Sequence, residues 1–227
     1  MSPPYRLAIF DFDGTLADSW RLMGRALVEA ADDFGYRRLS DEEAEALRGQ
    51  DNRAVMAAMG VKMWQLPRIV AHMRQVALQN ADQITLFPEI GAMLQAAAAA
   101  DVRLAVVSSN GEAAIRRVLG EDLSALVCEF ACGAAIFGKA TKFRRVLRRC
   151  HVEPALAVGV GDEGRDIDAA RAAGMASVAV TWGYATRDLL ESRAPTHVVT
   201  RVGDLTTLLT GRPTPSSSEE PAAPSDR

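Results

Sequence analysis

The chain has 227 residues, of which 48% are hydrophobic, and a formal net charge of −3. This length is enough for one large domain with a sizeable core, or for a core domain that carries an insertion. The charge, and the absence of a basic patch interleaved with aromatic residues, argue against a nucleic-acid partner. The apolar runs are too short to span a bilayer, no signal-peptide pattern opens the sequence, and the three cysteines are scattered. We therefore expect a cytoplasmic protein without membrane contact or a disulfide framework.

Residues 7–16 combine an apolar run with two acids and a glycine, in the order Leu-Ala-Ile-Phe-Asp-Phe-Asp-Gly-Thr-Leu. A run this short and apolar is typical of a central parallel strand that is buried on both faces. Asp11 and Asp13 at its end would lose hydration, which costs free energy unless another group compensates the charge. A divalent cation is one such group. The alternative is that the two acids cap the helix that follows.

Residues 18–82 are predicted to form four helices and no strand. Apolar residues recur at helical spacing up to Gly35, which is suited to ending a helix. Ser40 and Glu43 have the spacing of a capping box, and Pro67 suits the first position of a later helix. We expect a compact helical cap inserted between the first strand and the rest of the fold.

Strands and helices alternate after residue 83, which predicts an α/β fold: a Rossmann-like parallel sheet with helices on both faces. The core should comprise residues 1–17 and 83–211. Residues 212–227 are rich in Pro, Ser, Glu and Ala without periodicity, which predicts a disordered tail. Expected strands cover 103–108, 126–131, 156–162, 177–181 and 197–199, and expected helices cover 91–101, 113–119, 141–150, 166–173 and 204–209.

Polar residues follow several of the predicted strands, where a parallel sheet places its binding site. Asp11 and Asp13 end the first strand, Ser108 ends the second, and Asp162 ends the fourth, with Asp166 one helical turn later. Taken singly, each of these residues could cap a helix or interact with its dipole. Their joint occurrence in this order favours a site.

A lysine completes this set of residues. Lys139 precedes a predicted helix, and taken alone it could be a surface lysine. Lys142 competes with it for the same role, as Ser109 competes with Ser108. We favour Lys139 because a loop before a helix can direct its side chain inward, and Ser108 because it directly follows the apolar run.

The D-x-D-G-T of Asp11 to Thr15 and the G-D-x-x-x-D of Gly161 to Asp166 resemble the haloacid dehalogenase superfamily of phosphatases. The similarity is to the branch that includes phosphoglycolate phosphatase and β-phosphoglucomutase. It covers the chain from about Tyr5 to Leu209, including the helical cap. The family often has Lys-Pro where this chain has Lys139 followed by alanine.

The resemblance implies a role for each site residue. Asp11 would be the nucleophile that forms an aspartyl-phosphate, and Asp13 would be the general acid and then the general base. Mg²⁺ would be held by the Asp11 carboxylate, the Asp13 backbone carbonyl and Asp162, with Asp166 orienting a ligand or a metal-bound water. The implied substrate-binding residues are Thr15, Ser108, Ser109, Asn110, Lys139 and Arg53 of the cap segment 47–53, although Arg53 could equally face solvent.

The resemblance therefore implies a Mg²⁺-dependent phosphomonoesterase that acts on a small phosphorylated metabolite. One alternative is a sugar phosphomutase, which would pass the phosphoryl group to a sugar rather than to water. Another is a phospho-accepting signalling protein, in which the phosphorylated acid follows the third strand rather than the first. Dehalogenation is disfavoured because it needs no second acid, and Asp13 is present.

Overall fold

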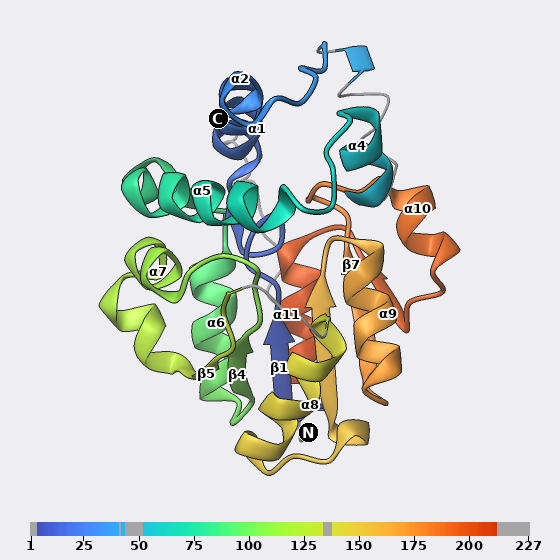
Figure 1. The fold of residues 1–227 in the computed structure, drawn as a ribbon. Coiled ribbons are helices and arrows are strands. Elements are labelled where there is room, and N and C mark those ends of the chain that lie inside the picture. The colour runs from blue at the N-terminus through green and yellow to red at the C-terminus, as the bar shows by residue number, and fades with distance from the viewer. Residues whose placement is uncertain (1–3, 41, 44–51, 134–137, 213–227) are drawn as a thin grey trace, which may run out of the picture.

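The computed structural model describes residues 4–40, 42–43, 52–133 and 138–212 (Figure 1). Its centre is a six-stranded parallel sheet with the strand order β5-β4-β1-β6-β7-β8. The apolar strand β1 is fully buried between β4 and β6, as its sequence predicts. The strands are β1 (Leu7–Phe10), β4 (Arg103–Val106), β5 (Val127–Phe130), β6 (Ala157–Gly161), β7 (Ala176–Val180) and β8 (His197–Val199).

Helices cover both faces of this sheet and bury a separate apolar cluster on each. On one face, α6 (Ile90–Ala99), α7 (Glu112–Leu126) and α11 (Val202–Thr210) contribute buried residues such as Ile90, Ile115 and Leu205. On the other face, α8 (Lys139–Cys150) and α9 (Gly164–Ala172) contribute Phe143 and Ala170. The short helix α10 (Arg187–Ser192) packs beside α9. The fold is thus of the α/β, Rossmann-like class, as predicted.

A second group of helices lies beyond the edge of the sheet toward which β1 points (Figure 1). It includes α1 (Trp20–Glu29), α2 (Ala31–Phe34), α4 (Asn52–Ala58) and α5 (Leu66–Gln79), and it has its own apolar cluster around Tyr36, Met59 and Ile69. A two-stranded antiparallel pair, β2 (Ala17–Asp18) with β3 (Thr85–Leu86), lies where the chain enters and leaves this group. Short 3-10 helices cover 81–83 and 154–156.

Several local predictions are confirmed and others are wrong in their bounds. The Ser40 and Glu43 capping box is present, with the Ser40 amide donating to Glu43 and the Glu43 amide donating to Ser40. The absence of strands from 18–82 is wrong at its first residue, because Asp18 belongs to β2. The helix predicted at 141–150 begins at Lys139, because Gly138 with φ 80° starts the turn earlier. The sequence pattern did not predict α10 or β3.

Two expectations fall on residues outside the described ranges: residues 47–51 of the cap segment 47–53, and the tail from residue 213. The division into core, cap and tail stays a prediction. Across the described residues, no helix combines the length and the apolar character that a membrane crossing requires.

Candidate active site

The predicted site residues meet at the carboxyl edge of the sheet. Asp11 directly follows β1 and Asp162 directly follows β6, the neighbouring strand. Asp166 lies in the first turn of α9, and Lys139 is the first residue of α8. Parallel strands end at the same edge, so residues that are distant in the sequence become neighbours there.

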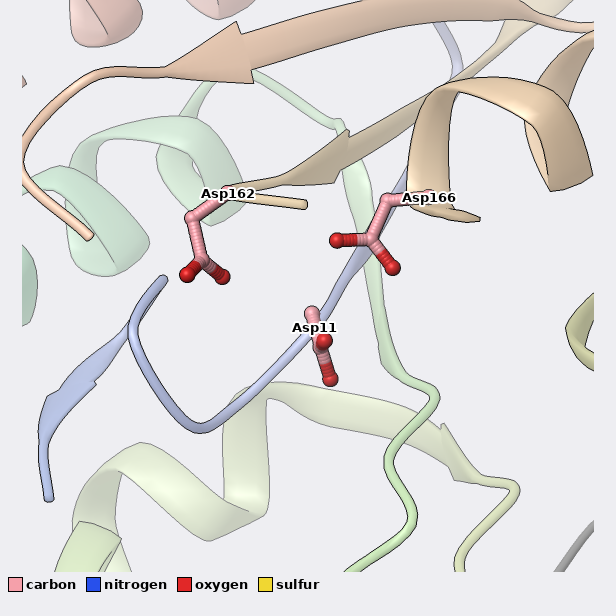
Figure 2. A group of neighbouring side chains, drawn as sticks. All are labelled: Asp11, Asp162 and Asp166. Carbon is pink, nitrogen blue, oxygen red and sulfur yellow. The ribbon is translucent and has the colours of Figure 1, made fainter. Parts of the chain in front are cut away.

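Three buried carboxylates converge at this edge (Figure 2). Asp11, Asp162 and Asp166 are each less than 5% exposed, and one oxygen of each lies within 4.8 Å of one oxygen of the other two. Oxygen donors in a compact group with excess negative charge are the ligands that hard divalent cations prefer. The three residues could therefore hold such an ion.

The neighbours of Asp162 fix its position closely. The Thr15 hydroxyl donates to Asp162 Oδ1 at 2.7 Å, and the Tyr184 amide donates to Oδ2 at 2.9 Å. Two glycines leave space for it: a β-carbon on Gly14 would lie 2.2 Å from Asp162 Oδ2, and one on Gly183 would lie 2.3 Å from Asp162 Cβ. Gly14 also has φ 78°, a conformation that glycine adopts without strain.

Asp166 is held by the start of its own helix and by Lys139. Its Oδ2 accepts a 3.0 Å hydrogen bond from the amide of Glu163, as half of a capping box. Its Oδ1 accepts a 2.6 Å hydrogen bond from Lys139 Nζ. A β-carbon on Gly161 would lie 2.3 Å from Asp166 Oδ2, so a glycine is needed there too.

The two carboxylate oxygens of Asp11 have different partners. Oδ1 accepts the Phe12 amide at 2.8 Å. Oδ2 is buried, and its partner is Lys139, whose Nζ lies 2.7 Å away as an ion pair. Burial raises the pKa of Asp11, but the charges of Lys139 and Arg165 outweigh it and the net pKa is lowered. Asp11 is thus an ionised carboxylate with an oxygen available to react.

The cluster as a whole carries more negative than positive charge. Burial, followed by the charges of Asp166 and Glu163, raises the pKa of Asp162 well above its usual range. Burial raises the pKa of Glu163 to about 7 despite the nearby charge of Arg165. Lys139 and Arg165 offset only part of these charges, so a bound cation would relieve the remainder.

Asp13 lies in a different environment from Asp11. Its Oδ1 accepts a 2.8 Å hydrogen bond from Ser19, and Asn110 Nδ2 lies 3.4 Å from its Oδ2. Burial raises the pKa of Asp13 to about 6, with the Ser19 hydrogen bond opposing the rise and the Asp11 charge adding to it. The two acids at the end of β1 thus differ in pKa, and Asp13 still exchanges a proton close to neutral pH, a pattern typical of acid–base sites.

The two candidate lysines occupy different places. Lys139 contacts Asp11 and Asp166, whereas Lys142 Nζ donates to two backbone carbonyls, Ser108 O at 2.7 Å and Gly133 O at 2.5 Å. Burial lowers the pKa of Lys142 to about 8. Lys139 therefore lies at the clustered carboxylates, whereas Lys142 contacts the backbone of the loop that follows β4.

That loop carries the other predicted substrate-binding residues. Ser108 is buried, and its hydroxyl accepts the Asn110 amide at 3.0 Å. Asn110 is buried and reaches Asp13, while Ser109 is exposed and its carbonyl accepts a 2.8 Å hydrogen bond from Arg74 Nε of α5. The hydroxyls of Ser108 and Ser109 therefore do not occupy equivalent places. The Arg53 side chain is outside what the structure describes.

The sequence motifs assigned no role to three further residues at this edge: Ser19, Tyr184 and Arg74. Ser19 connects Asp13 to the Tyr184 hydroxyl, which lies 2.6 Å from the Ser19 Oγ. Tyr184 is an aromatic residue after a predicted strand, which is a weak signal of a role at the site, but Arg74 is one of several arginines on predicted helices and has no such signal.

Comparison with known proteins agrees with this geometry. Residues 8–180 match the family described as haloacid dehalogenase-like hydrolase. The chain is 31% identical over 198 residues to a phosphoglycolate phosphatase of Synechococcus elongatus, covering 87% of this chain and 93% of that protein. It is also 31% identical over 197 residues to the tyrosine-protein kinase PtkA of Mycobacterium tuberculosis, covering 85% and 68%.

The fold is found in solved structures at low sequence identity. A predicted phosphatase from Clostridium acetobutylicum superposes with a TM-score of 0.78 at 16% identity, over 92% of this chain and 99% of that one. At this identity the likeness concerns the fold alone.

Proposed function

This chain belongs to the haloacid dehalogenase-like hydrolase family as one of its phosphatases, and we propose that it hydrolyses a small phosphate monoester through a phosphorylated Asp11. The observation that carries the proposal is the difference between Asp11 and Asp13, the two acids at the end of β1. Asp11 is ionised, with a buried oxygen whose partner is the Lys139 ammonium, and Asp13 has a pKa of about 6. One is suited to attack phosphorus and the other to exchange a proton.

In the first step, a carboxylate oxygen of Asp11 attacks the phosphorus atom. The new Asp11 O–P bond forms as the ester P–O bond breaks. Protonated Asp13 gives its proton to the leaving oxygen, so the product alcohol departs neutral. The turn after β1 supports this use of both acids, because the amides of Leu16 and Ala17 donate back to Phe12 O and fold the chain tightly.

In the second step, water attacks the phosphorus atom of the phosphorylated Asp11. Asp13, now ionised, takes a proton from this water, the Asp11 O–P bond breaks, and inorganic phosphate leaves. Both forms of Asp13 are needed in one cycle, and a pKa near 6 keeps both accessible around neutral pH. The hydrogen bonds from Ser19 and Asn110 hold its carboxylate in place.

The residues present fit a divalent cation, and we propose Mg²⁺. Asp11 and Asp162 would hold it with the Asp13 carbonyl, and Asp166, which Lys139 and the Glu163 amide already bind, would orient a ligand or a bound water. When bound, the ion would withdraw charge from the phosphoryl oxygens. The compact group of three buried carboxylates and the raised pKa of Asp162 are the observations that support this fit.

Lys139 and the Ser108–Asn110 loop would bind the phosphoryl oxygens. Lys139 Nζ, 2.7 Å from Asp11 Oδ2, is close enough to contact a group that reacts at that carboxylate. The loop after β4 offers hydroxyl and amide donors beside Asp13. Donors fixed before the reaction stabilise the charge that develops in phosphoryl transfer.

The test uses purified protein, p-nitrophenyl phosphate and Mg²⁺. We expect turnover that EDTA abolishes and that Asp11→Asn lowers at least about 10³-fold. Acetyl phosphate should label wild type at a single aspartate, and mass spectrometry should locate the label at Asp11. No turnover together with no label would refute the proposal.

A panel of phosphorylated metabolites, beginning with 2-phosphoglycolate, would then rank the substrates, since relatives of this chain are named phosphoglycolate phosphatase. A sugar phosphate isomerised faster than it is hydrolysed would favour the mutase alternative. Transfer of phosphate from ATP to a tyrosine peptide, without ester hydrolysis, would favour the activity named for PtkA.

A further inference from the structure

Two of the three cysteines, which are scattered in the sequence, meet in the fold. Cys128 belongs to β5, and Cys150 is the last residue of α8, which packs against β5 away from the cap helices (Figure 1). The two sulfur atoms are 3.4 Å apart, although the residues are 22 positions apart in the chain. The proposed function uses neither thiol, so this contact needs an explanation of its own.

An irregularity in the pairing of β5 positions Cys128. β5 is an edge strand of the sheet, and its register with β4 shifts between Leu104 and Ala105, where one step along β4 corresponds to two steps along β5. Cys128 is therefore the extra residue of a β-bulge. Bulges at sheet edges redirect a side chain, and here the sulfur of Cys128 reaches Cys150.

The residues beside the two cysteines hold the sulfur atoms in this arrangement. Arg149, next to Cys150, forms a 2.5 Å ion pair with Glu129, next to Cys128. The Cys150 carbonyl accepts a 2.5 Å hydrogen bond from Arg103 Nη1 of β4. A disulfide bond is about 2 Å long, so a small rotation of the two cysteine side chains is enough to form one.

The two thiols differ in their exposure and in how strongly they hold a proton. Cys128 is exposed, whereas Cys150 is only 2% exposed. Burial, followed by the hydrogen bond and the charge of Cys128, raises the pKa of Cys150 to about 12. Cys150 therefore keeps its proton and donates it to the Cys128 sulfur. An exposed sulfur with a second thiol beside it is the arrangement of a reactive cysteine and its resolving cysteine.

We propose that Cys128 and Cys150 form a reversible disulfide when hydrogen peroxide oxidises the protein. The Cys128 sulfur attacks a peroxide oxygen: an S–O bond forms, the O–O bond breaks, and water leaves with the Cys128 proton. The Cys150 sulfur then attacks the Cys128 sulfur: the S–S bond forms, the S–O bond breaks, and the hydroxyl leaves as water with the Cys150 proton. The thiols lose two electrons and two protons, and the peroxide becomes two water molecules.

The disulfide joins β5 to the helix that begins with Lys139. It closes a loop between residues 22 positions apart, which restricts the unfolded chain and so stabilises the folded one. Lys139 lies inside this loop, at the opposite end of α8 from Cys150. Oxidation therefore braces the helix that carries Lys139.

The experiment treats the purified protein with hydrogen peroxide, titrates the free thiols after unfolding, and compares the Tm before and after reduction by dithiothreitol. We expect wild type to lose two of its three thiols and to melt roughly 5–10 °C higher when it is oxidised than when it is reduced. Cys132→Ser retains only the proposed pair, so it should lose both thiols and show the same rise in Tm. Peptide mapping of oxidised Cys132→Ser should find Cys128 joined to Cys150.

Cys128→Ser removes the bond at an exposed position, where the substitution should not prevent folding. Its oxidised and reduced forms should have the same Tm, and comparing each protein with its own reduced form cancels any effect of the substitution itself. The inference is wrong if wild type keeps all its thiols, if the cross-link involves Cys132, or if oxidation leaves the Tm unchanged. These measurements use no substrate, so their outcome is independent of the proposed function.

Discussion

Lys139, the first residue of α8, donates a 2.6 Å hydrogen bond to Asp166 in the first turn of α9. The same Nζ atom lies 2.7 Å from Asp11 Oδ2. One ammonium group therefore links two helices and two of the three clustered carboxylates. Burial lowers the pKa of Lys139, but Asp11 and Asp166 outweigh it and the net pKa is raised, so the lysine stays charged.

This contact predicts different outcomes for the two neighbouring lysines. Lys139→Met should lower kcat/KM for p-nitrophenyl phosphate about 10²–10³-fold, because it removes a charged donor at the carboxylate that we propose as the nucleophile. Lys142→Met removes hydrogen bonds to backbone carbonyls and should cost roughly tenfold or less. A larger loss for Lys142→Met than for Lys139→Met would show that the roles are reversed. Thermal melting of both variants checks that each is folded.

The sequence was sufficient to predict most of the sheet and the acids at its edge. Apolar runs such as residues 7–10 are fully buried, and their polar ends share one edge because parallel strands require it. Gly138 explains one error, since its φ of 80° allows α8 to begin two residues before the periodic pattern does. The two-residue strands β2 and β3 are too short to have a recognisable period.

The contacts that tune the site could not be read from the sequence. Ser19 hydrogen-bonds Asp13 because the turn after β1 brings residue 19 back, and spacing alone does not reveal that. Arg74 meets Ser109 only because α5 packs over the sheet edge, a tertiary contact across 35 residues. Lys139 and Lys142 share one face of α8, so the choice between them depends on which turn of the helix reaches the acids.

From the hydrogen bond between Ser19 and Asp13 we expect a measurable change in the pH dependence of kcat/KM. Burial raises the pKa of Asp13 to about 6, and the Ser19 hydrogen bond restrains that rise by favouring the ionised form. Ser19→Ala should therefore raise the pKa of Asp13 further. The proposed first step requires protonated Asp13, so the alkaline limb of the kcat/KM profile should move to higher pH.

Initial rates from pH 4.5 to 9 at saturating Mg²⁺ measure this shift. Ser192→Ala, which removes a surface hydroxyl that bonds Leu189 O in α10, should leave the profile unchanged. A shift of the alkaline limb to lower pH in Ser19→Ala would contradict the assignment of Asp13 as the general acid.

Gly183 offers a test of how tightly Asp162 is held. A β-carbon at Gly183 would lie 2.3 Å from Asp162 Cβ and 2.4 Å from Gly14 O, so Gly183→Ala must displace one of them. We expect the Mg²⁺ concentration for half-maximal activity to rise at least about tenfold, because misplaced ligands bind metal less well. Gly24→Ala, in α1 with open space around it, should instead stabilise the protein by roughly 0.5–1 kcal/mol. Unchanged Mg²⁺ dependence in Gly183→Ala would indicate that Asp162 is not a metal ligand.

The raised pKa of Asp162 also determines how we expect the stability of the protein to depend on pH and on metal. Burial, followed by the charges of Asp166 and Glu163, raises its folded-state pKa well above the usual value. The folded state therefore retains a proton that the unfolded chain has released, and stability falls as pH rises from the unfolded pKa through the folded one. In EDTA, wild type should thus have a lower Tm at pH 8 than at pH 6.

Asp162→Asn separates the charge from the shape of this side chain. The amide cannot ionise, and the Thr15 hydroxyl can rotate to accept from its nitrogen, so in EDTA at pH 8 the variant should melt above wild type. With Mg²⁺ the order should reverse, because the ion stabilises only the chain that retains the carboxylate, by an amount that grows with its concentration. Differential scanning calorimetry of both proteins, with and without Mg²⁺, measures this. An equal Mg²⁺-induced rise in Tm for both would show that the ion binds elsewhere.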